Sequence, residues 1–268
     1  MFFKFTKTFL QKNHLLYLQL DFTIMILTID VGNTRIKVAV FEQNKLLEKF
    51  IFEADIFESS LKNILNAYSS IQKIIVSSVG AAKIKDFLSF IDPEKLVFIS
   101  HETQFPFENL YKTPKTLGID RMVLAAGAVL AFPAQNRLVI DAGTCVTYDY
   151  INHKNQYLGG AISPGLRLRY GALNNYTANL PLLETHSPDK TIGDSTQNAI
   201  HSGVVNGLIY EINGFVADFE ASNHNFIIIL TGGDAIFLAK RLKNTIFANS
   251  NFLLESLNFI HIYNSKND

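Results

Sequence analysis

The sequence has little or none of two residue types and lacks several common motifs, and each absence narrows the class of protein to which it can belong. Its 268 residues include one cysteine, Cys145, and no tryptophan. A single cysteine forms neither an intramolecular disulfide nor a cysteine metal cluster, which suits a reducing, cytoplasmic location. Acidic and basic residues number 24 each, so the net charge is zero and no overall basic field favours nucleic acid or an anionic membrane. We therefore expect neither as a partner.

The familiar nucleotide and zinc motifs are missing too. The chain has no Gly-x-x-x-x-Gly-Lys-Ser/Thr loop, which excludes a P-loop enzyme, and no Gly-x-Gly-x-x-Gly after a strand, which disfavours a dinucleotide-binding Rossmann unit. His-Glu-x-x-His is absent, and the seven scattered histidines are more typical of structural or surface positions. Cys145 has no obvious activating base beside it, and we expect a small buried residue there.

The first 24 residues differ from the rest of the chain. Their apolar run is broken by Gln19 and Asp21, so it is too short to span a bilayer, and it lacks the small-residue cleavage site of a signal peptide. Met25 stands directly before the first strongly apolar strand. We predict that Met25 is the native start and that residues 1–24 are an extension foreign to the native protein, which N-terminal sequencing of that protein would test.

What the sequence does contain is organised around residues 27–41. An apolar run ends in Asp30, a polar turn with a glycine comes next, and apolar residues then alternate along a second strand. The same design returns at residues 138–150, where an apolar run ends in Asp141 before another glycine-containing turn. The two copies predict an internal duplication.

Periodicity and turn residues predict the remaining elements. In the first half we expect strands near 25–31, 35–42, 46–52, 73–79 and 96–99, helices near 57–68 and 82–90, and a loop over 101–117. In the second half we expect strands within 138–150 and at 156–162, 226–230 and 257–262, and helices over 118–132, to about 174, over 194–220 and to about 242. Each half opens with three strands, which predicts an α/β fold of two lobes, 25–117 and 118–268, with both Asp-Gly turns at a common cleft.

Asp30 and Asp141 are the first candidates for the site. An aspartate at the carboxyl end of a strand in an α/β sheet points toward the usual ligand crevice, and two of them would hold a cation and the phosphates of a nucleotide. Gly32 and Gly143 allow backbone N–H groups to approach phosphate oxygens closely. Lys37 either adds a positive charge on a phosphate or is an outward-facing strand lysine, and these two interpretations carry equal weight.

Asp120 is the best candidate for the reacting carboxylate. It lies in Gly118-Ile119-Asp120-Arg121 at the predicted start of a helix, where backbone N–H groups and the helix dipole favour anions. Asp120 could accept a hydroxyl proton while Arg121 steadies phosphate charge. The alternative is a helix cap, and from these four residues alone the cap is favoured.

Two glycine-rich segments complete the candidates. Residues 159–165, Gly-Gly-Ala-Ile-Ser-Pro-Gly, predict a close approach of the backbone to a ligand or to the facing lobe. Residues 231–234, Thr-Gly-Gly-Asp, come directly after a predicted strand and open a helix. They suit a nucleotide sugar or phosphate, and a plain tight turn is about equally favoured.

Together these motifs resemble those of the type III pantothenate kinases, in the actin-like ATPase superfamily. Seven motifs occur in family order from about Met25 to the C-terminus, and although each is weak alone, seven in order are specific. They are Asp30-Val31-Gly32-Asn33-Thr34 with Lys37, Gly118-x-Asp120-Arg121, Asp141-x-Gly143-Thr144-x-x-Thr147, Gly159-Gly160-x-Ile162-x-Pro164-Gly165, Ala178-x-Leu180-Pro181, Ile192-Gly193-x-x-Thr196 and Thr231-Gly232-Gly233-Asp234.

The resemblance implies ATP-dependent phosphorylation of pantothenate to 4'-phosphopantothenate, the first step of coenzyme A biosynthesis. It implies two duplicated ribonuclease-H-like lobes, a homodimer, Mg²⁺, and a monovalent cation, K⁺ or NH₄⁺. Asp120 is then the proton acceptor, and Asp141 the ligand of the monovalent cation. Residues implied to contact ATP are Asp30, Val31, Gly32, Asn33, Thr34, Arg35, Ile36, Lys37 and Thr144. Residues implied to contact pantothenate are Tyr111, Gly118, Ile119, Asp120, Arg121 and Thr196, the last as a candidate for reaching across the dimer.

The sequence leaves open two alternative functions for the protein, and it also leaves open the role of Arg121. A sugar or acetate-type kinase of the same superfamily would keep the Asp-Gly turns but would not need Gly118-x-Asp120-Arg121 with Tyr111 upstream. A non-catalytic accessory relative should have lost Asp30 or Asp120, and this chain keeps both. A kinase assay with pantothenate and with hexoses separates the three. The sequence also leaves open whether Arg121 binds the pantothenate carboxylate or the transferred phosphoryl group.

Overall fold

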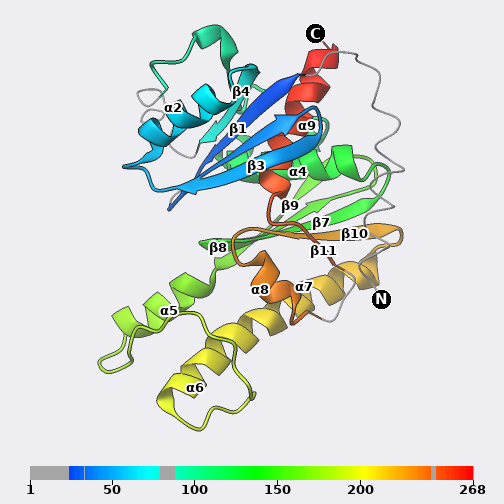
Figure 1. Ribbon diagram of the computed structural model, residues 1–268. Coiled ribbons are helices and arrows are strands. Elements are labelled where there is room, and N and C mark those ends of the chain that lie inside the picture. Colours follow the sequence, from blue (N-terminus) through cyan, green and yellow to red (C-terminus); the bar gives the residue numbers. More distant parts are fainter. Residues whose placement is uncertain (1–23, 33, 79–87, 243–245, 268) are drawn as a thin grey trace, which may run out of the picture.

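The computed structural model describes residues 24–32, 34–78, 88–242 and 246–267, and two mixed β-sheets form its framework (Figure 1). The first sheet has the strand order β3-β2-β1-β4-β5, with β1 at Met25–Val31, β2 at Ile36–Glu42, β3 at Lys45–Phe52, β4 at Ile71–Ser78 and β5 at Leu96–Phe98. The second has the order β11-β10-β7-β8-β9-β6, with β6 at Glu108–Asn109, β7 at Asn136–Ala142, β8 at Cys145–Ile151, β9 at Gln156–Pro164, β10 at Phe226–Thr231 and β11 at Phe247–Ala248.

The helices fall into groups on the faces of these sheets. They are α2 (Phe57–Ala67), α4 (Ile119–Ala131), α5 (Leu166–Asn175), α6 (Thr196–His201), α7 (Gly207–Ser222), α8 (Ala235–Ala239) and α9 (Phe252–Asn267), with 3₁₀ turns η1 (Pro93–Lys95) and η2 (Pro114–Thr116). A π-helical segment, η3 (Ser202–Asn206), joins α6 to α7, so the helix predicted over 194–220 is present with altered winding at its middle. In the part of the chain that the structure describes, no helix is long and apolar enough to cross a membrane.

Both sheets share the same plan, which confirms the predicted α/β fold and its duplicated opening. In the first sheet β1, β2 and β3 form an antiparallel meander, and β4 and β5 run parallel to β1. In the second sheet β7, β8 and β9 repeat the meander, and β10 and β11 run parallel to β7. Asp30 pairs with Lys37 across the first hairpin, and Asp141 with Thr147 across the second. The two aspartates therefore occupy equivalent positions, one residue before the end of β1 and of β7.

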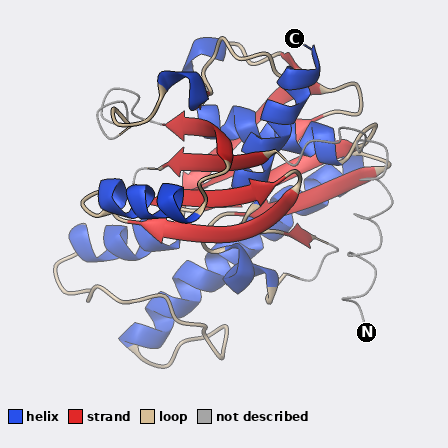
Figure 2. Ribbon diagram, turned by 45° about the horizontal axis from the view of Figure 1, so that its top comes forward, coloured by secondary structure: helices blue, strands red, loops and turns tan. Residues whose placement is uncertain are grey.

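The sheets and helices stack in layers, with α4 and α9 between the two sheets (Figures 1 and 2). Apolar residues point to both faces of β1 and β2, because side chains alternate along a strand. On one face Ile29 and Val38 pack with α2, and on the other Ile26 and Ala39 belong to a core shared with α4, α9 and the second sheet. The far face of the second sheet packs against α5, η3, α7 and α8. The two sheets are thus joined through a common core.

The prediction of a strand near 257–262 is wrong, because these residues belong to α9. Leu253, Leu257 and Ile260 recur at three- and four-residue spacing and are buried against α4. The two helices cross so closely that a Cβ on Gly127 of α4 would lie 1.8 Å from the Ser256 Oγ. A short apolar run fits a strand or a buried helix equally well, and here the close partner helix decided.

Two segments cross between the halves of the chain. Within the predicted loop 101–117, β6 pairs with β9 of the second sheet, and α9 returns from the second half to pack on the first sheet. The lobe boundary predicted at 117/118 stays a prediction. Of the helix predicted near 82–90, residues 82–87 lie outside the described residues and 88–90 form a turn. Residues 1–23 of the predicted extension also lie outside them.

Candidate active site

The first Asp-Gly turn presents a buried carboxylate beside a lysine. Asp30 is 5% exposed, and its Oδ1 accepts a hydrogen bond from the Ser77 Oγ of β4 at 3.0 Å. Lys37 places its Nζ 4.0 Å from Asp30 Oδ2, so it faces the aspartate. Burial raises the pKa of Asp30 to about 6, although Lys37 and Ser77 act in the opposite direction and favour the ionised form.

The turns of the two sheets meet, as the duplicated motifs predict. Thr34 Oγ1 and Thr144 Oγ1 lie 3.4 Å apart, although 110 residues separate them in the sequence. The Gly32 N–H donates to the Arg35 carbonyl at 3.2 Å, which closes the first turn. Asn33, a predicted ATP contact, lies outside the described residues. Of the other predicted contacts in this stretch, Ile36 is buried in the core, while Arg35 is exposed.

Asp141 carries the second carboxylate, and the Thr231–Asp234 turn lies against it. Burial of the carboxylate raises the pKa of Asp141 to about 7, with Lys37 lowering it and Asp120 and Asp30 raising it further. Gly232 has φ +97°, and a Cβ there would lie 2.4 Å from Asp141 Oδ1. Only glycine adopts that backbone at so short a distance without strain.

Asp120 completes the group of acids at the N-terminus of α4. Its Oδ1 accepts a hydrogen bond from the Arg121 N–H at 2.8 Å, and a Cβ on Gly118 would lie 2.4 Å from the same oxygen. The charge of Asp120 raises the pKa of both Asp30 and Asp141. The charge of Asp120 therefore acts on both aspartates, and Lys37 lowers the pKa of the same two. Among the described residues, no three acidic, histidine or cysteine side chains lie close enough together to hold one metal ion.

Arg121 is held by a buried acid next to Tyr111. Its Nε and Nη2 lie 2.8 and 2.7 Å from Asp149 Oδ1, and Asp149 also accepts hydrogen bonds from the Tyr157 hydroxyl at 2.6 Å and the Thr147 hydroxyl at 3.1 Å. Burial opposes the charge of Arg121, but Asp149 outweighs it and raises the pKa of Arg121. The guanidinium lies 5.9 Å from the centre of the Tyr111 ring.

Gly159 and Gly160, in the middle of β9, lie against this pair. Gly159 has φ +114°, and a Cβ there would lie 3.5 Å from the Tyr111 ring. A Cβ on Gly160 would lie 3.0 Å from Arg121 Nη2 and 1.7 Å from the Tyr148 carbonyl. The structure shows close approaches of this backbone to Tyr111, Arg121 and the Tyr148 carbonyl, while an approach to a ligand stays a prediction.

Sequence reasoning missed two groups that orient site residues. Ser77 fixes Asp30 from a neighbouring strand, and nothing in its local sequence distinguishes it. Asp149 fixes Arg121 and is fully buried in the structure; its signal in the sequence was a single charged residue within the strand at 145–151. Cys145, expected to be buried, is exposed beside Thr144. Ile119 packs against the core shared by the two sheets.

Thr196 is the predicted site residue that the fold sets apart. It is the first residue of α6, which projects away from both sheets (Figure 1), and it is exposed. Among the described residues, no hydrogen bond joins it to the three aspartates or to Tyr111 and Arg121. Within one chain, the structure joins the two turns at Thr34 and Thr144 and places Arg121 beside Tyr111, and it gives Thr196 no such contact among the described residues.

Comparison with known proteins gives consistent results. A protein-family model described as type III pantothenate kinase matches residues 26–218. A type III pantothenate kinase from Flavobacterium johnsoniae is 62% identical over 244 residues, which cover 91% of this chain and 100% of that protein. The one from Flavobacterium psychrophilum is 58% identical over 239 residues, covering 89% and 99%. A solved structure of a conserved Baf family protein from Campylobacter jejuni matches with a TM-score of 0.61 at 22% identity, over 90% of this chain and 99% of that one, which supports the fold.

Proposed function

The chain belongs to the type III pantothenate kinase family, and we propose that Asp30, Asp120 and Asp141 position ATP and pantothenate for phosphoryl transfer. It is a phosphotransferase that uses ATP to phosphorylate pantothenate in coenzyme A biosynthesis. The observation that carries the proposal is the meeting of the two turns at Thr34 and Thr144, with Asp120 within electrostatic reach of both. Phosphoryl transfer depends mainly on positioning and on neutralising charge, and this arrangement can supply both.

Asp120 is the proposed general base. Its carboxylate is fixed by the Arg121 N–H and by the close approach of Gly118, so it has a defined direction at the start of α4. A base within hydrogen-bond reach of the pantothenate hydroxyl would take its proton as the oxygen attacks the γ-phosphorus. The cap interpretation concerns the same residue, but a cap alone does not explain why Asp120 lies close enough to influence both Asp30 and Asp141.

The two turns are the proposed ATP site. Backbone N–H groups of residues 31–34 and the Thr144 hydroxyl would bind the phosphates, and Lys37 would add positive charge. The 4.0 Å approach of Lys37 to Asp30, and its lowering of the pKa of both Asp30 and Asp141, support the inward-facing interpretation of this lysine. Arg35 is exposed at the end of the same turn, where it can reach ligand from the solvent side.

The chemistry of the site fits bound cations. Asp30 and Asp141 are desolvated carboxylates, and burial raises their pKa values to about 6 and about 7, with the charge of Asp120 acting in the same direction on both. Positive charge beside them would keep both ionised. We propose that Asp141 holds K⁺ or NH₄⁺ and that Asp30 lies beside Mg²⁺ bound to ATP. Such cations neutralise phosphate charge when they are bound.

We propose that pantothenate binds beside Tyr111 and Arg121, between the start of α4 and the Gly159-Gly160 part of β9. The charge of Arg121 is already matched by Asp149, which is fully buried. A matched guanidinium still donates hydrogen bonds but adds little net charge to a developing phosphate. We therefore favour binding of pantothenate by Arg121, together with Gly118 and Ile119, over stabilisation of the transferred group.

A homodimer would account for Thr196. Large apolar side chains are exposed near it in the sequence, with Tyr176 88%, Leu182 64% and Ile192 83% exposed. Burying such side chains against a second copy would be favourable by about 1.5–3 kcal/mol for each one fully buried. We propose that this segment forms the dimer contact and presents Thr196 to the partner's pantothenate. An Ile192→Asp variant that stays dimeric in light scattering would contradict this contact.

A coupled assay of ADP formation tests the function. Protein begun at Met25 should form ADP with ATP and pantothenate, and not with hexoses. Turnover only with a hexose would support the sugar-kinase alternative, and no turnover with either substrate would support the accessory one. We propose a cytoplasmic location, because its substrates and its single cysteine suit that compartment.

A further inference from the structure

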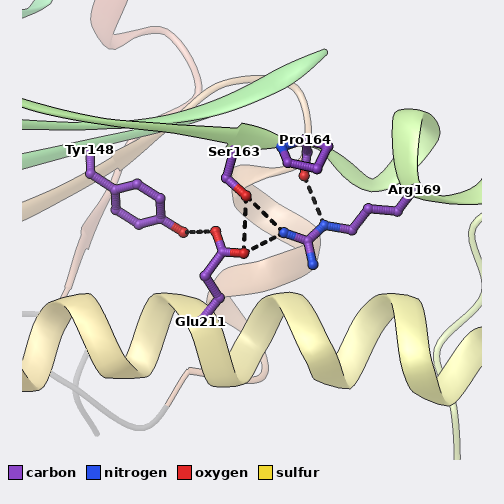
Figure 3. A network of polar contacts seen from close by, with 5 residues as sticks. All are labelled: Tyr148, Ser163, Pro164, Arg169 and Glu211. Carbon is purple, nitrogen blue, oxygen red and sulfur yellow. Dashed lines mark hydrogen bonds and ion pairs between the residues drawn. The ribbon is translucent and has the colours of Figure 1, made fainter. Parts of the chain in front are cut away.

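A polar network centred on Glu211 links Tyr148, Ser163, Pro164 and Arg169 (Figure 3), and none of the roles above uses it. Glu211 of α7 accepts hydrogen bonds from the Tyr148 hydroxyl at 2.8 Å and the Ser163 hydroxyl at 3.0 Å, and it forms an ion pair with Arg169 of α5. Arg169 also donates through Nε to the Pro164 carbonyl at 2.8 Å and through Nη2 to Ser163 Oγ at 2.9 Å. These contacts join β8, β9, α5 and α7.

Pro164, the last residue of the network, is followed directly by a residue that contacts the proposed ATP site. Gly165 comes directly after Pro164 and donates its N–H to the Thr144 carbonyl at 3.0 Å. A Cβ on Gly165 would lie 2.2 Å from the Gly143 carbonyl oxygen and 2.6 Å from that of Thr144. The junction between β9 and α5 therefore rests directly on the turn. Because interiors are close-packed, a displacement of Pro164 would displace Thr144 as well.

The charges within the network favour a fixed geometry. The side chains of Arg169 and Glu211 are 20% and 25% exposed. Burial opposes ionisation of Glu211, but hydrogen bonds from Arg169, Tyr148 and Ser163 outweigh it and hold the pKa of Glu211 below its ordinary value. An ionised carboxylate with three donors, paired to a forked guanidinium, is suited to orienting neighbours.

We infer that Arg169 and Glu211 are positioning residues for ATP, which hold the Pro164–Gly165 junction against Thr144 and so fix the second phosphate-binding turn. The inference rests on the proposed function, because it takes Thr144 as an ATP contact. Tyr111 and Asp120 lie on other segments, so the effect of the network should fall on ATP rather than on pantothenate. A network that only ties α7 to the sheet would alter stability and leave ATP binding unchanged.

Arg169→Lys is the most direct test. Lysine keeps the positive charge beside Glu211 but lacks the planar fork that also reaches Pro164. We expect the Kd of a non-hydrolysable ATP analogue and the KM for ATP to rise about tenfold, and the KM for pantothenate to change by less than about twofold. Arg169→Met, which removes the ion pair as well, should raise both ATP constants at least as much. The control is Lys62→Met, which breaks an exposed ion pair with Glu58 on α2 and should leave them unchanged.

The outcomes separate the inference from the proposed function. Unchanged ATP constants in an Arg169→Lys protein with a cooperative thermal transition would overturn the inference, and so would KM values for both substrates that rise together. If Arg169→Met does not fold, Arg169→Lys decides. If the unmodified protein binds the analogue but forms no ADP with pantothenate, the proposed function fails, while the Kd comparison still tests the positioning role.

Discussion

The proposed role of Asp120 can be tested by replacing its carboxylate with an amide. Asp120→Asn keeps the size of the side chain and an oxygen that can accept from the Arg121 N–H, so the start of α4 should be preserved. It removes the group that would take the proton from pantothenate. Because a positioned general base contributes about 10²–10⁴-fold, we expect kcat to fall at least about a hundredfold, or about 2.7 kcal/mol of barrier.

The same substitution should leave the affinity for ATP intact and change only how that affinity depends on pH. Burial raises the pKa of Asp30 to about 6 and that of Asp141 to about 7, and the charge of Asp120 adds a smaller contribution in the same direction to both. Without that charge both values should fall, and both carboxylates would stay ionised at lower pH. Titration calorimetry with ATP and its cations should therefore show that affinity is retained, and that its decline on acidification begins at a lower pH than in the unmodified protein.

Measuring ADP formation and ATP binding on the same preparations decides whether Asp120 is the general base. Asp218→Asn, an exposed aspartate of α7, is the matched control and should match the unmodified protein in both measurements. Turnover of Asp120→Asn within about tenfold of the unmodified protein, about 1.4 kcal/mol of barrier, would refute Asp120 as the base. If Asp120→Asn loses both ATP binding and turnover, Asp120 supports the nucleotide site rather than the proton transfer.

Three shorter predictions concern the same site. Replacing K⁺ or NH₄⁺ by Na⁺ should lower kcat, and rates indifferent to the cation would contradict Asp141 as its ligand. Without cations, the free energy of unfolding should fall as pH rises from about 4 to about 7, because Asp30 and Asp141 keep their protons up to about pH 6 and 7 in the folded chain but lose them near 3.8 in the unfolded chain. Thermal melts of Asp141→Asn should show a smaller dependence of stability on pH. An unchanged pH dependence would refute the raised pKa of Asp141. Iodoacetamide should alkylate Cys145, which is exposed, more slowly when ATP is bound, and equal rates would place ATP away from this turn.

Local patterns were enough to predict the strands that carry the site. Apolar runs ending in Asp30 and Asp141 are recognisable because a buried strand must be apolar up to the point where it leaves the core. The turns were recognisable for a similar reason, since glycine is needed where backbone approaches other groups closely. These signals lie within a few residues of each other, so they survive in the sequence without knowledge of the fold.

Predictions failed where a distant partner decides. The run at 257–262 became the middle of α9 because its apolar face packs on α4, more than a hundred residues earlier in the chain. Cys145 was expected to be buried, but it stands at the exposed first residue of β8. Neither outcome can be read from a local pattern, because both depend on which surfaces are covered after the sheets have packed.

The sequence by itself determined the acids, the turns and the family to which they belong. The fold decided how these groups act together, because contacts such as the 3.4 Å approach of Thr34 to Thr144 join residues 110 positions apart. It also decided the support of Asp30 by Ser77 and of Arg121 by Asp149. The raised pKa values of Asp30 and Asp141 arise from desolvation, and desolvation exists only once the surrounding chain has closed over the carboxylates.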